Sequence, residues 1–134
     1  MIVDTSALIA ILKGEPDAEP LTRLIFEAEK VKISAATLVE ARTVVRVHTG
    51  PVGARQLESL IRELGIEIIP FTAAQADLAT RAIEDFGRRS GSPAKLNLGD
   101  CFSYALAAET GESLAFVGED FVHTDVRDAS TGRG

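Results

Sequence analysis

Acidic residues recur in this 134-residue sequence where strands are expected to end and helices to begin. Asp4 directly follows a short apolar run, Asp100 stands in the first turn of a helical pattern, and Glu119 and Asp120 follow a second apolar run. In open α/β sheets, ligand sites lie at the ends of strands. Each of these acids could instead only cap a helix or stabilise a turn, since Asp is favoured at both kinds of position. Their recurrence at comparable places favours one shared site.

Glu40 is a further candidate, because it lies inside a helical pattern that covers residues 35–47. Its neighbours at helical spacing, Ala36, Val44 and Val47, are apolar, so the carboxylate is expected to point inward. An inward glutamate is costly unless it is paired, protonated or bound to a metal ion. The competing interpretation is a glutamate at the edge of the apolar stripe that forms a salt bridge.

If these acids meet, their mutual repulsion needs compensation. Two unit charges about 5 Å apart at an effective dielectric constant of about 20 repel by about 3 kcal/mol. Such a cluster must hold a proton, bind a cation or remain hydrated. Ligand sets made only of oxygen favour Mg²⁺ or Mn²⁺, and the few candidate zinc ligands, Cys101, His48 and His123, form no recognisable zinc motif.

Elements that could position the acids alternate along the chain as strand and helix, which is typical of a mostly parallel sheet covered on both faces. Strands are expected at 1–3, 31–34, 66–69 and 113–117, with an edge strand at 122–126. Helices are expected around 7–12, 21–28, 35–47, 54–64, 72–86 and 98–109, and the stretch 87–95 is expected to be a basic loop. A single domain over residues 1–127 and a flexible tail over 128–134 follow from this pattern.

Bulk properties agree with one globular domain. Hydrophobic residues make up 46% of the chain and charged residues 25%. The net charge of −6 disfavours a protein that holds nucleic acid on a broad basic surface. The lone cysteine, the lack of a leader-like start and the lack of a long apolar run lead us to expect a cytoplasmic protein.

Four segments, 2–8, 34–41, 98–107 and 116–121, together resemble the PIN-domain ribonucleases, specifically the VapC toxins of bacterial type II toxin–antitoxin pairs. The resemblance covers essentially the whole chain in the order and spacing of that family. It implies a three-layer α/β/α sandwich with an acidic pocket that binds Mg²⁺, for which Mn²⁺ could substitute. It also implies RNA cleavage, a homodimer, and inhibition by a cognate antitoxin protein.

The resemblance assigns catalytic roles to Asp4, Glu40 and Asp100. It places the fourth acid at Asp120, with the adjacent Glu119 as a competitor. Asp4 and Asp100 are expected to bind the metal directly, and the other two acids to complete its surroundings. Attack by water would then leave 5′-phosphate and 3′-hydroxyl ends on the RNA.

Hydroxyl and basic residues complete the expected site. Thr5 or Ser6 matches a hydroxyl position of the family and is expected to orient a carboxylate or a metal-bound water. The candidates for RNA phosphate contacts are Arg42, Arg46, Arg88, Arg89 and Lys95. For each of these basic residues, a solvated surface position is an equally good interpretation.

Three other classes of protein share some of these features. A signalling receiver with an acidic Mg²⁺ pocket needs an aspartate at the end of a central strand, but the strand ending at Ile69 is followed by Pro70. A phosphatase with an aspartate nucleophile needs a second aspartate two positions after the first, and Ser6 stands there. A PIN-like module that only binds a partner is disfavoured by the complete set of acids.

Overall fold

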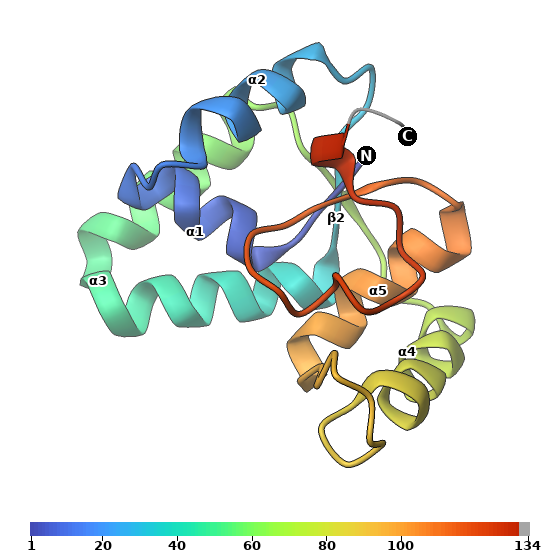
Figure 1. The fold of residues 1–134 in the computed structure, drawn as a ribbon. Helices are drawn as coiled ribbons and strands as arrows, with labels where there is room; N and C mark the ends of the chain where they lie inside the picture. Colours follow the sequence, from blue (N-terminus) through green and yellow to red (C-terminus); the bar gives the residue numbers. More distant parts are fainter. Residues whose placement is uncertain (132–134) are drawn as a thin grey trace.

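The computed structural model describes residues 1–131 as a sheet flanked by helices (Figure 1). The elements in chain order are β1 (Ile2–Val3), α1 (Thr5–Lys13), α2 (Ala18–Glu27), β2 (Lys32–Ser34), α3 (Ala35–Glu63), β3 (Glu67–Ile69), α4 (Ala73–Phe86), α5 (Leu98–Thr110), β4 (Leu114–Ala115) and the 3₁₀ helix η1 (Ala129–Thr131). No helix within this part of the chain is long and apolar enough to cross a membrane.

The sheet is parallel throughout, with the strand order β3-β2-β1-β4. The first strand is therefore central: Ile2 is in register with Lys32 on one side and with Leu114 on the other. Because all four strands run the same way, their carboxyl ends lie at one edge of the sheet. This confirms the predicted mostly parallel sheet.

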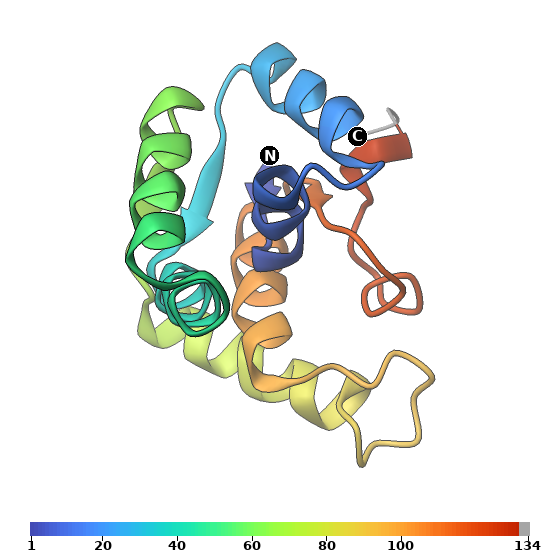
Figure 2. The same ribbon diagram turned by 90° about the vertical axis from the view of Figure 1, so that its left-hand side faces the viewer.

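Helices cover both faces of the sheet, as Figures 1 and 2 show. Val3 and Ile33 pack into one core with residues of α1, α2 and α3, whereas Ile2 and Leu114 pack into a second core with residues of α4 and α5. Adjacent residues of β1 thus face opposite sides, as the alternation of a strand requires. The predicted three-layer α/β/α sandwich is confirmed.

Polar side chains start the helices at the carboxyl edge of the sheet. Asp4 caps α1, Ser34 caps α3 and Asn97 caps α5, each accepting a hydrogen bond from a backbone N–H of the first turn. Ser34 and Asp4 are also the residues that directly follow or end a strand. The ends of β1 and β2 therefore coincide with the starts of α1 and α3, so both helices begin at the carboxyl edge of the sheet.

Helix α3 is two helical segments joined at one residue. Gly50 has φ 68° and ψ −161°, a conformation that favours glycine, and Pro51 follows as the first residue of the next segment. The sequence predicts that the helix ends at residue 47 and that a second one starts at residue 54. The break is present, but the first segment continues to residue 49 and the second starts at Pro51. Arg42 and Glu58 join the two segments through two hydrogen bonds of 3.1 and 2.7 Å.

The predicted edge strand at 122–126 is wrong, because residues 120–123 form a turn and residues 124–125 a bend. The Thr124 hydroxyl donates to the carbonyl of Phe121, and the Tyr104 hydroxyl donates to Asp125, so local and side-chain bonds replace a strand ladder. The free edge of β4 is paired further along, where the Leu114 N–H donates to the carbonyl of Arg127.

Residues 128–131, expected as the start of a flexible tail, form a bridge to Leu114 at Asp128 and the helix η1. Ala129 is buried in the core beside α1–α3. The remainder of the expected tail, residues 132–134, lies outside the residues that the structure describes.

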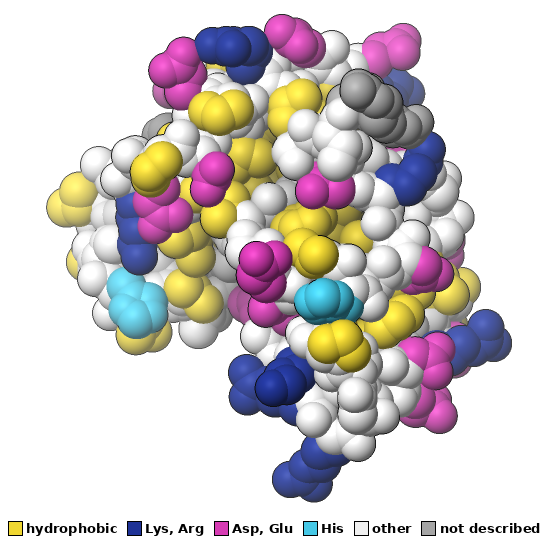
Figure 3. Space-filling view, in the orientation of Figure 1, with side chains coloured by type: hydrophobic (Ala, Val, Ile, Leu, Met, Phe, Trp, Pro, Cys, Tyr) yellow, Lys and Arg dark blue, Asp and Glu magenta, His cyan; other side chains and the backbone are white. Residues whose placement is uncertain are grey.

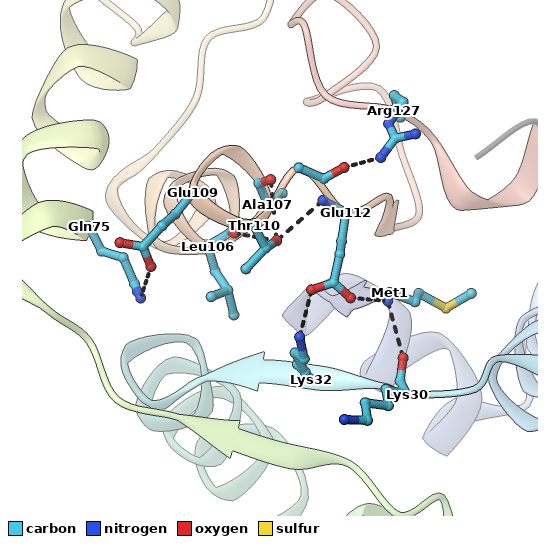
Figure 4. A network of polar contacts seen from close by, with 11 residues as sticks. Met1, Lys30, Lys32, Gln75, Leu106, Ala107, Glu109, Thr110, Glu112 and Arg127 are labelled. Atoms are coloured by element: carbon cyan, nitrogen blue, oxygen red, sulfur yellow. Dashed lines mark hydrogen bonds and ion pairs between the residues drawn. The ribbon is translucent and has the colours of Figure 1, made fainter.

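Glu112 forms ion pairs at the amino ends of the strands, on the side of the sheet opposite the carboxyl edge (Figure 4). Its carboxylate accepts from the Met1 ammonium and from Lys32, each at 2.7 Å. Burial acts to raise the pKa of Glu112, but these hydrogen bonds and positive charges lower it below its ordinary value. This ion-paired cluster holds the starts of β1 and β2 against the turn before β4.

Candidate active site

Asp4 lies at the centre of the carboxyl edge, at the end of β1, and is only 3% exposed. Its Oδ2 accepts from the Ser6 N–H at 3.0 Å and from the Ser6 hydroxyl at 2.8 Å. Its Oδ1 accepts from the Ser103 hydroxyl at 2.5 Å. Burial raises the pKa of Asp4, and the donated hydrogen bonds offset only part of that rise. Ser6 Oγ in turn accepts from the Val117 N–H, which links Asp4 to the end of β4.

Glu40 reaches the same region from the second turn of α3. Its Oε1 accepts from the Thr5 hydroxyl at 2.7 Å, and a methyl group at position 99 would overlap its carboxylate. Gly99 is thus required for Glu40 to lie against the first turn of α5. Burial raises the pKa of Glu40, and the nearby charge of Asp4 raises it further against the hydrogen bond from Thr5.

The inward direction predicted for Glu40 is correct, but the stripe predicted around it is not. The buried face of this part of α3 consists of Thr37, Leu38, Ala41 and Val45, and Val47 is 74% exposed. Glu40 therefore lies at the margin of the buried face. It is hydrogen-bonded there to Thr5 and forms no salt bridge with any of residues 1–131.

Asp100 occupies the first turn of α5 and is 8% exposed. Its Oδ2 accepts from the Asn97 N–H at 3.0 Å, while its own N–H donates to Asn97 Oδ1 at 2.8 Å, so the two form a capping box. Burial raises the pKa of Asp100 to about 7, and the charges of Asp4 and Asp120 add to this effect. Asp100 can therefore both cap α5 and belong to the candidate site, so the two interpretations do not exclude each other.

Asp120 lies in the turn after β4, close enough to Asp100 to raise the pKa of its carboxyl group. The turn is fixed by the buried Phe121, whose ring packs on Phe116 with centroids 5.2 Å apart. The Glu119 side chain is exposed and makes no hydrogen bond or ion pair with any of residues 1–131. The geometry thus favours Asp120 over Glu119 as the fourth acid.

The carboxylates of the four acids lie near one another, and their negative charges repel. Asp4 raises the pKa of both Glu40 and Asp100, and Asp120 raises that of Asp100. Within residues 1–131, no three Asp, Glu, His or Cys side chains are gathered closely enough to hold one metal ion as they stand. The oxygen-only ligand set and the raised pKa values fit a hard divalent cation, which would have to draw these carboxylates closer.

Ser103 and Thr37 are parts of this site that sequence reasoning missed. Both hydroxyls are fully buried, and Thr37 Oγ1 lies 3.1 Å from Ser103 Oγ. The signal that could have found them is a hydroxyl residue on the core-facing stripe of a helix. A buried hydroxyl needs a hydrogen-bond partner. For Ser103 on α5, that partner is Asp4 at the end of β1.

The basic residues predicted to contact RNA differ in whether they form ion pairs within the protein. Arg42 is engaged with Glu58, whereas Arg46, Arg88, Arg89 and Lys95 are exposed and form no ion pair with any other described residue. The loop 87–95 projects between α4 and α5 (Figure 2), next to the helix start that carries Asp100. In Figure 3, acidic side chains lie near the centre of the face, and basic side chains lie below them towards this loop.

Cys101, next to Asp100, has no role as a nucleophile. It is fully buried, and burial together with the charge of Asp100 raises the pKa of its thiol to about 12. A thiol in this state is protonated at neutral pH and unreactive.

Comparison with known proteins identifies the family of the chain. Residues 1–127 match the model of the PIN domain. Ribonuclease VapC42 of Mycobacterium tuberculosis is 44% identical over 131 residues, which cover 98% of this chain and all of that protein. Ribonuclease VapC28 of the same organism is 47% identical over 129 residues, covering 96% of this chain and 97% of that protein.

Solved structures show the same fold. Mycobacterium tuberculosis VapC20, described as a Sarcin-Ricin loop cleaving toxin, superposes with a TM-score of 0.72 at 20% identity and covers 94% of this chain and 98% of its own. A toxin–antitoxin complex from Klebsiella pneumoniae contains a chain that superposes with a TM-score of 0.64, at 20% identity and with 92% of both chains covered. The chain described here belongs to the PIN-domain family and, within it, to the VapC ribonucleases.

Proposed function

We propose that this VapC ribonuclease is a toxin that hydrolyses RNA phosphodiester bonds with a divalent cation at Asp4, Glu40, Asp100 and Asp120. The observation that carries the proposal is the approach of four carboxylates, from segments far apart in the sequence, at one edge of the sheet. Three of them, Asp4, Glu40 and Asp100, have raised pKa values because they are buried, and the charge of Asp4 adds to the rise at the other two. The names of the relatives, which are ribonucleases, support the reaction class.

Asp4 and Asp100 would hold the cation directly, because they are the two most buried acids of the set. Glu40 and Asp120 would complete its surroundings from α3 and from the turn after β4. Bound there, Mg²⁺ or Mn²⁺ would acidify a water molecule and stabilise the charge that develops on the phosphate. Thr5 and Ser6 would keep Glu40 and Asp4 in place through the hydrogen bonds described above.

The test is RNA cleavage by the purified protein with Mg²⁺, with Mn²⁺ and with excess EDTA. We expect cleavage only with a divalent cation, leaving 5′-phosphate and 3′-hydroxyl ends that end-labelling identifies. Asp4→Asn or Asp100→Asn should lower the rate by on the order of 100-fold or more, since even groups behind metal ligands cost about 10–100-fold. Asp77→Asn, an exposed acid on α4, is the matched control. Full activity in EDTA would refute the proposal, because cleavage would then not depend on a cation. No cleavage with either cation would favour a PIN-like module that only binds a partner.

A protein antitoxin is the proposed partner, as the complex from Klebsiella pneumoniae is described as toxin with antitoxin. The surface that suits an apolar helix of such a partner is the groove between α1 and α3. Its apolar lining includes Ile9, Leu12 and Val44, and Val52 extends it along the second segment of α3.

Co-expression with the product of a neighbouring reading frame tests this partner. We expect the two proteins to co-purify and the pair to lose nuclease activity. Val52→Asp should weaken the complex, whereas Phe26→Asp, on α2 and similarly exposed, should not. Equal effects of the two substitutions would reject the groove. The homodimer implied by the family is a separate proposal, which light scattering of the purified protein tests.

A further inference from the structure

A chain of two buried hydroxyls runs from α3 through α5 to Asp4. The Ser103 hydroxyl lies 2.5 Å from Asp4 Oδ1, and the Thr37 hydroxyl lies 3.1 Å from that of Ser103. Both side chains are fully buried, so water does not compete for these contacts. Nothing in the proposed reaction assigns a role to either residue.

The direction of this chain follows from proton counting. A serine hydroxyl has one proton, and Ser103 donates it to Asp4. Ser103 Oγ must therefore accept from Thr37, which makes Thr37 the first donor and the ionised Asp4 the final acceptor. Successive donors of this kind polarise one another, so the contact with Asp4 is strengthened by the hydroxyl behind it.

The same counting restricts how Asp4 can bind a cation. A carboxylate offers about four lone-pair positions. Asp4 Oδ2 accepts two hydrogen bonds from Ser6, whereas Oδ1 accepts one from Ser103. Of the two oxygens, Oδ1 accepts fewer of these hydrogen bonds and is the better placed to accept a cation. Ser103 also prevents the carboxylate from rotating, because Oδ1 is tied to α5 while Oδ2 is tied to α1.

We propose that Ser103, supported by Thr37, is a positioning residue that presents Asp4 Oδ1 as a single-oxygen ligand to the divalent cation. The inference rests on the proposed metal-dependent function. It assigns Ser103 no contact with RNA and no part in proton transfer. Its effect is on cation affinity, through the orientation of Asp4.

The experiment is titration of the full-length protein with Mn²⁺, without RNA, by isothermal calorimetry. We expect Ser103→Ala to weaken Mn²⁺ binding about tenfold, the size typical of groups that orient metal ligands. Thr37→Val, which keeps the shape of the side chain, should weaken it less than Ser103→Ala. Thr22→Val is the control, since that hydroxyl donates to the Ala18 carbonyl on α2, away from Asp4.

A second measurement separates positioning from a general structural effect. RNA cleavage by Ser103→Ala should return to near the wild-type rate at saturating Mn²⁺, because all four acids are still present. A structural defect would lower the rate at every Mn²⁺ concentration and would overturn the proposal.

The outcomes for the two proposals differ. If the wild-type protein binds no Mn²⁺ and cleaves RNA without it, the proposed function fails, and this inference fails with it. If the wild type binds Mn²⁺ and Ser103→Ala binds it within twofold, only the role of Ser103 is refuted. Should Ser103→Ala not fold, Ser103→Cys decides, because its thiol has a similar shape but is a weak donor. Unchanged affinity in that variant would overturn the inference.

Discussion

Asp100 is the residue at which a proton and a cation compete most directly. Its pKa is about 7 in the folded protein, whereas an unperturbed aspartate has a pKa near 3.8. The folded state therefore holds a proton that the unfolded state releases. The stability that this proton provides is fully present below about pH 4 and is lost as the pH rises through 7.

We expect the free energy of unfolding of the metal-free protein to fall as the pH rises from about 4 to about 7. The pKa shift of Asp100 corresponds to a decrease in the free energy of unfolding of at most about 4 kcal/mol. Urea unfolding in EDTA at several pH values measures it. Asp100→Asn should flatten the curve, because its amide oxygen can still accept from the Asn97 N–H without carrying a charge. The same slope in wild type and variant would rule out Asp100 as its source.

Gly99 is a residue whose substitution should separate activity from stability. A methyl group there would overlap the Glu40 carboxylate, which is the mobile end of a long side chain and can move away. Gly99→Ala should therefore reduce RNA cleavage at least about tenfold, by analogy with other groups that orient metal-site ligands. The melting temperature should stay the same or rise, because alanine favours a helix more than glycine does.

Rates and melting curves of Gly99→Ala, beside those of the exposed neighbour Leu98→Ala, check this prediction. A variant that keeps wild-type activity would show that Glu40 does not need its place against α5. A variant that melts much earlier would show that the backbone, and not the glutamate, yields.

At the scale of elements, the break in α3 positions Arg42 for a structural role. Its guanidinium forms two hydrogen bonds to Glu58 across the break, and both side chains are partly exposed. Exposed pairs of this kind contribute about 0.2–1 kcal/mol. We expect a double-mutant cycle of Arg42→Ala and Glu58→Ala to give a coupling in this range, with little change in RNA affinity. A large loss of affinity in Arg42→Ala alone would restore it as an RNA contact.

The loop 87–95 is the better candidate for RNA contact. Arg88 and Arg89 are exposed, carry no ion pair with other described residues, and belong to the segment that leads into the Asp100 helix. Reversing both charges, Arg88→Glu with Arg89→Glu, should weaken RNA binding and reduce its dependence on salt. Fluorescence anisotropy at several salt concentrations measures both. Unchanged affinity and slope would leave these arginines as solvated surface residues.

Most elements could be predicted because local signals agree with the final packing. Hydroxyl, amide and carboxyl caps set the starts of α1, α3 and α5, and Gly50 with Pro51 set the break in α3. The failure at 122–126 has a physical cause. Valines there favour a strand, but the bonds of Thr124 and Tyr104 hold the segment in turns.

At the scale of the molecule, the acids could be predicted because parallel strands bring their carboxyl ends to one edge. The hydroxyls behind Asp4 could not, because the pairing of Ser103 with Thr37 depends on how α5 packs on α3. The direction of Glu40 could be predicted, but the surrounding stripe could not, since Val47 is exposed near the end of its helical segment.

Because the overall charge is −6, we expect RNA binding to depend on a cation at the proposed site. Without a cation, the carboxylates and the phosphates repel one another, so affinity should be low in EDTA and rise by at least tenfold with Mg²⁺. Asp100→Asn, which is expected to be inactive, should bind RNA in EDTA more tightly than the wild type does. Anisotropy with the two proteins tests this, and equal affinities in EDTA would show that repulsion at the site does not govern binding.

The strand order has a consequence for how the protein is made. The central strand, β1, is synthesised first but gains its second neighbour only when β4 follows at residues 114–115. Until then Asp4 lacks the Val117 anchor and Asp120 has not been translated. A ribosome-bound chain halted after residue 110 should therefore show no nuclease activity. Incomplete chains of the enzyme would then not cleave RNA during synthesis. Cleavage by such an arrested chain would show that the first three acids suffice.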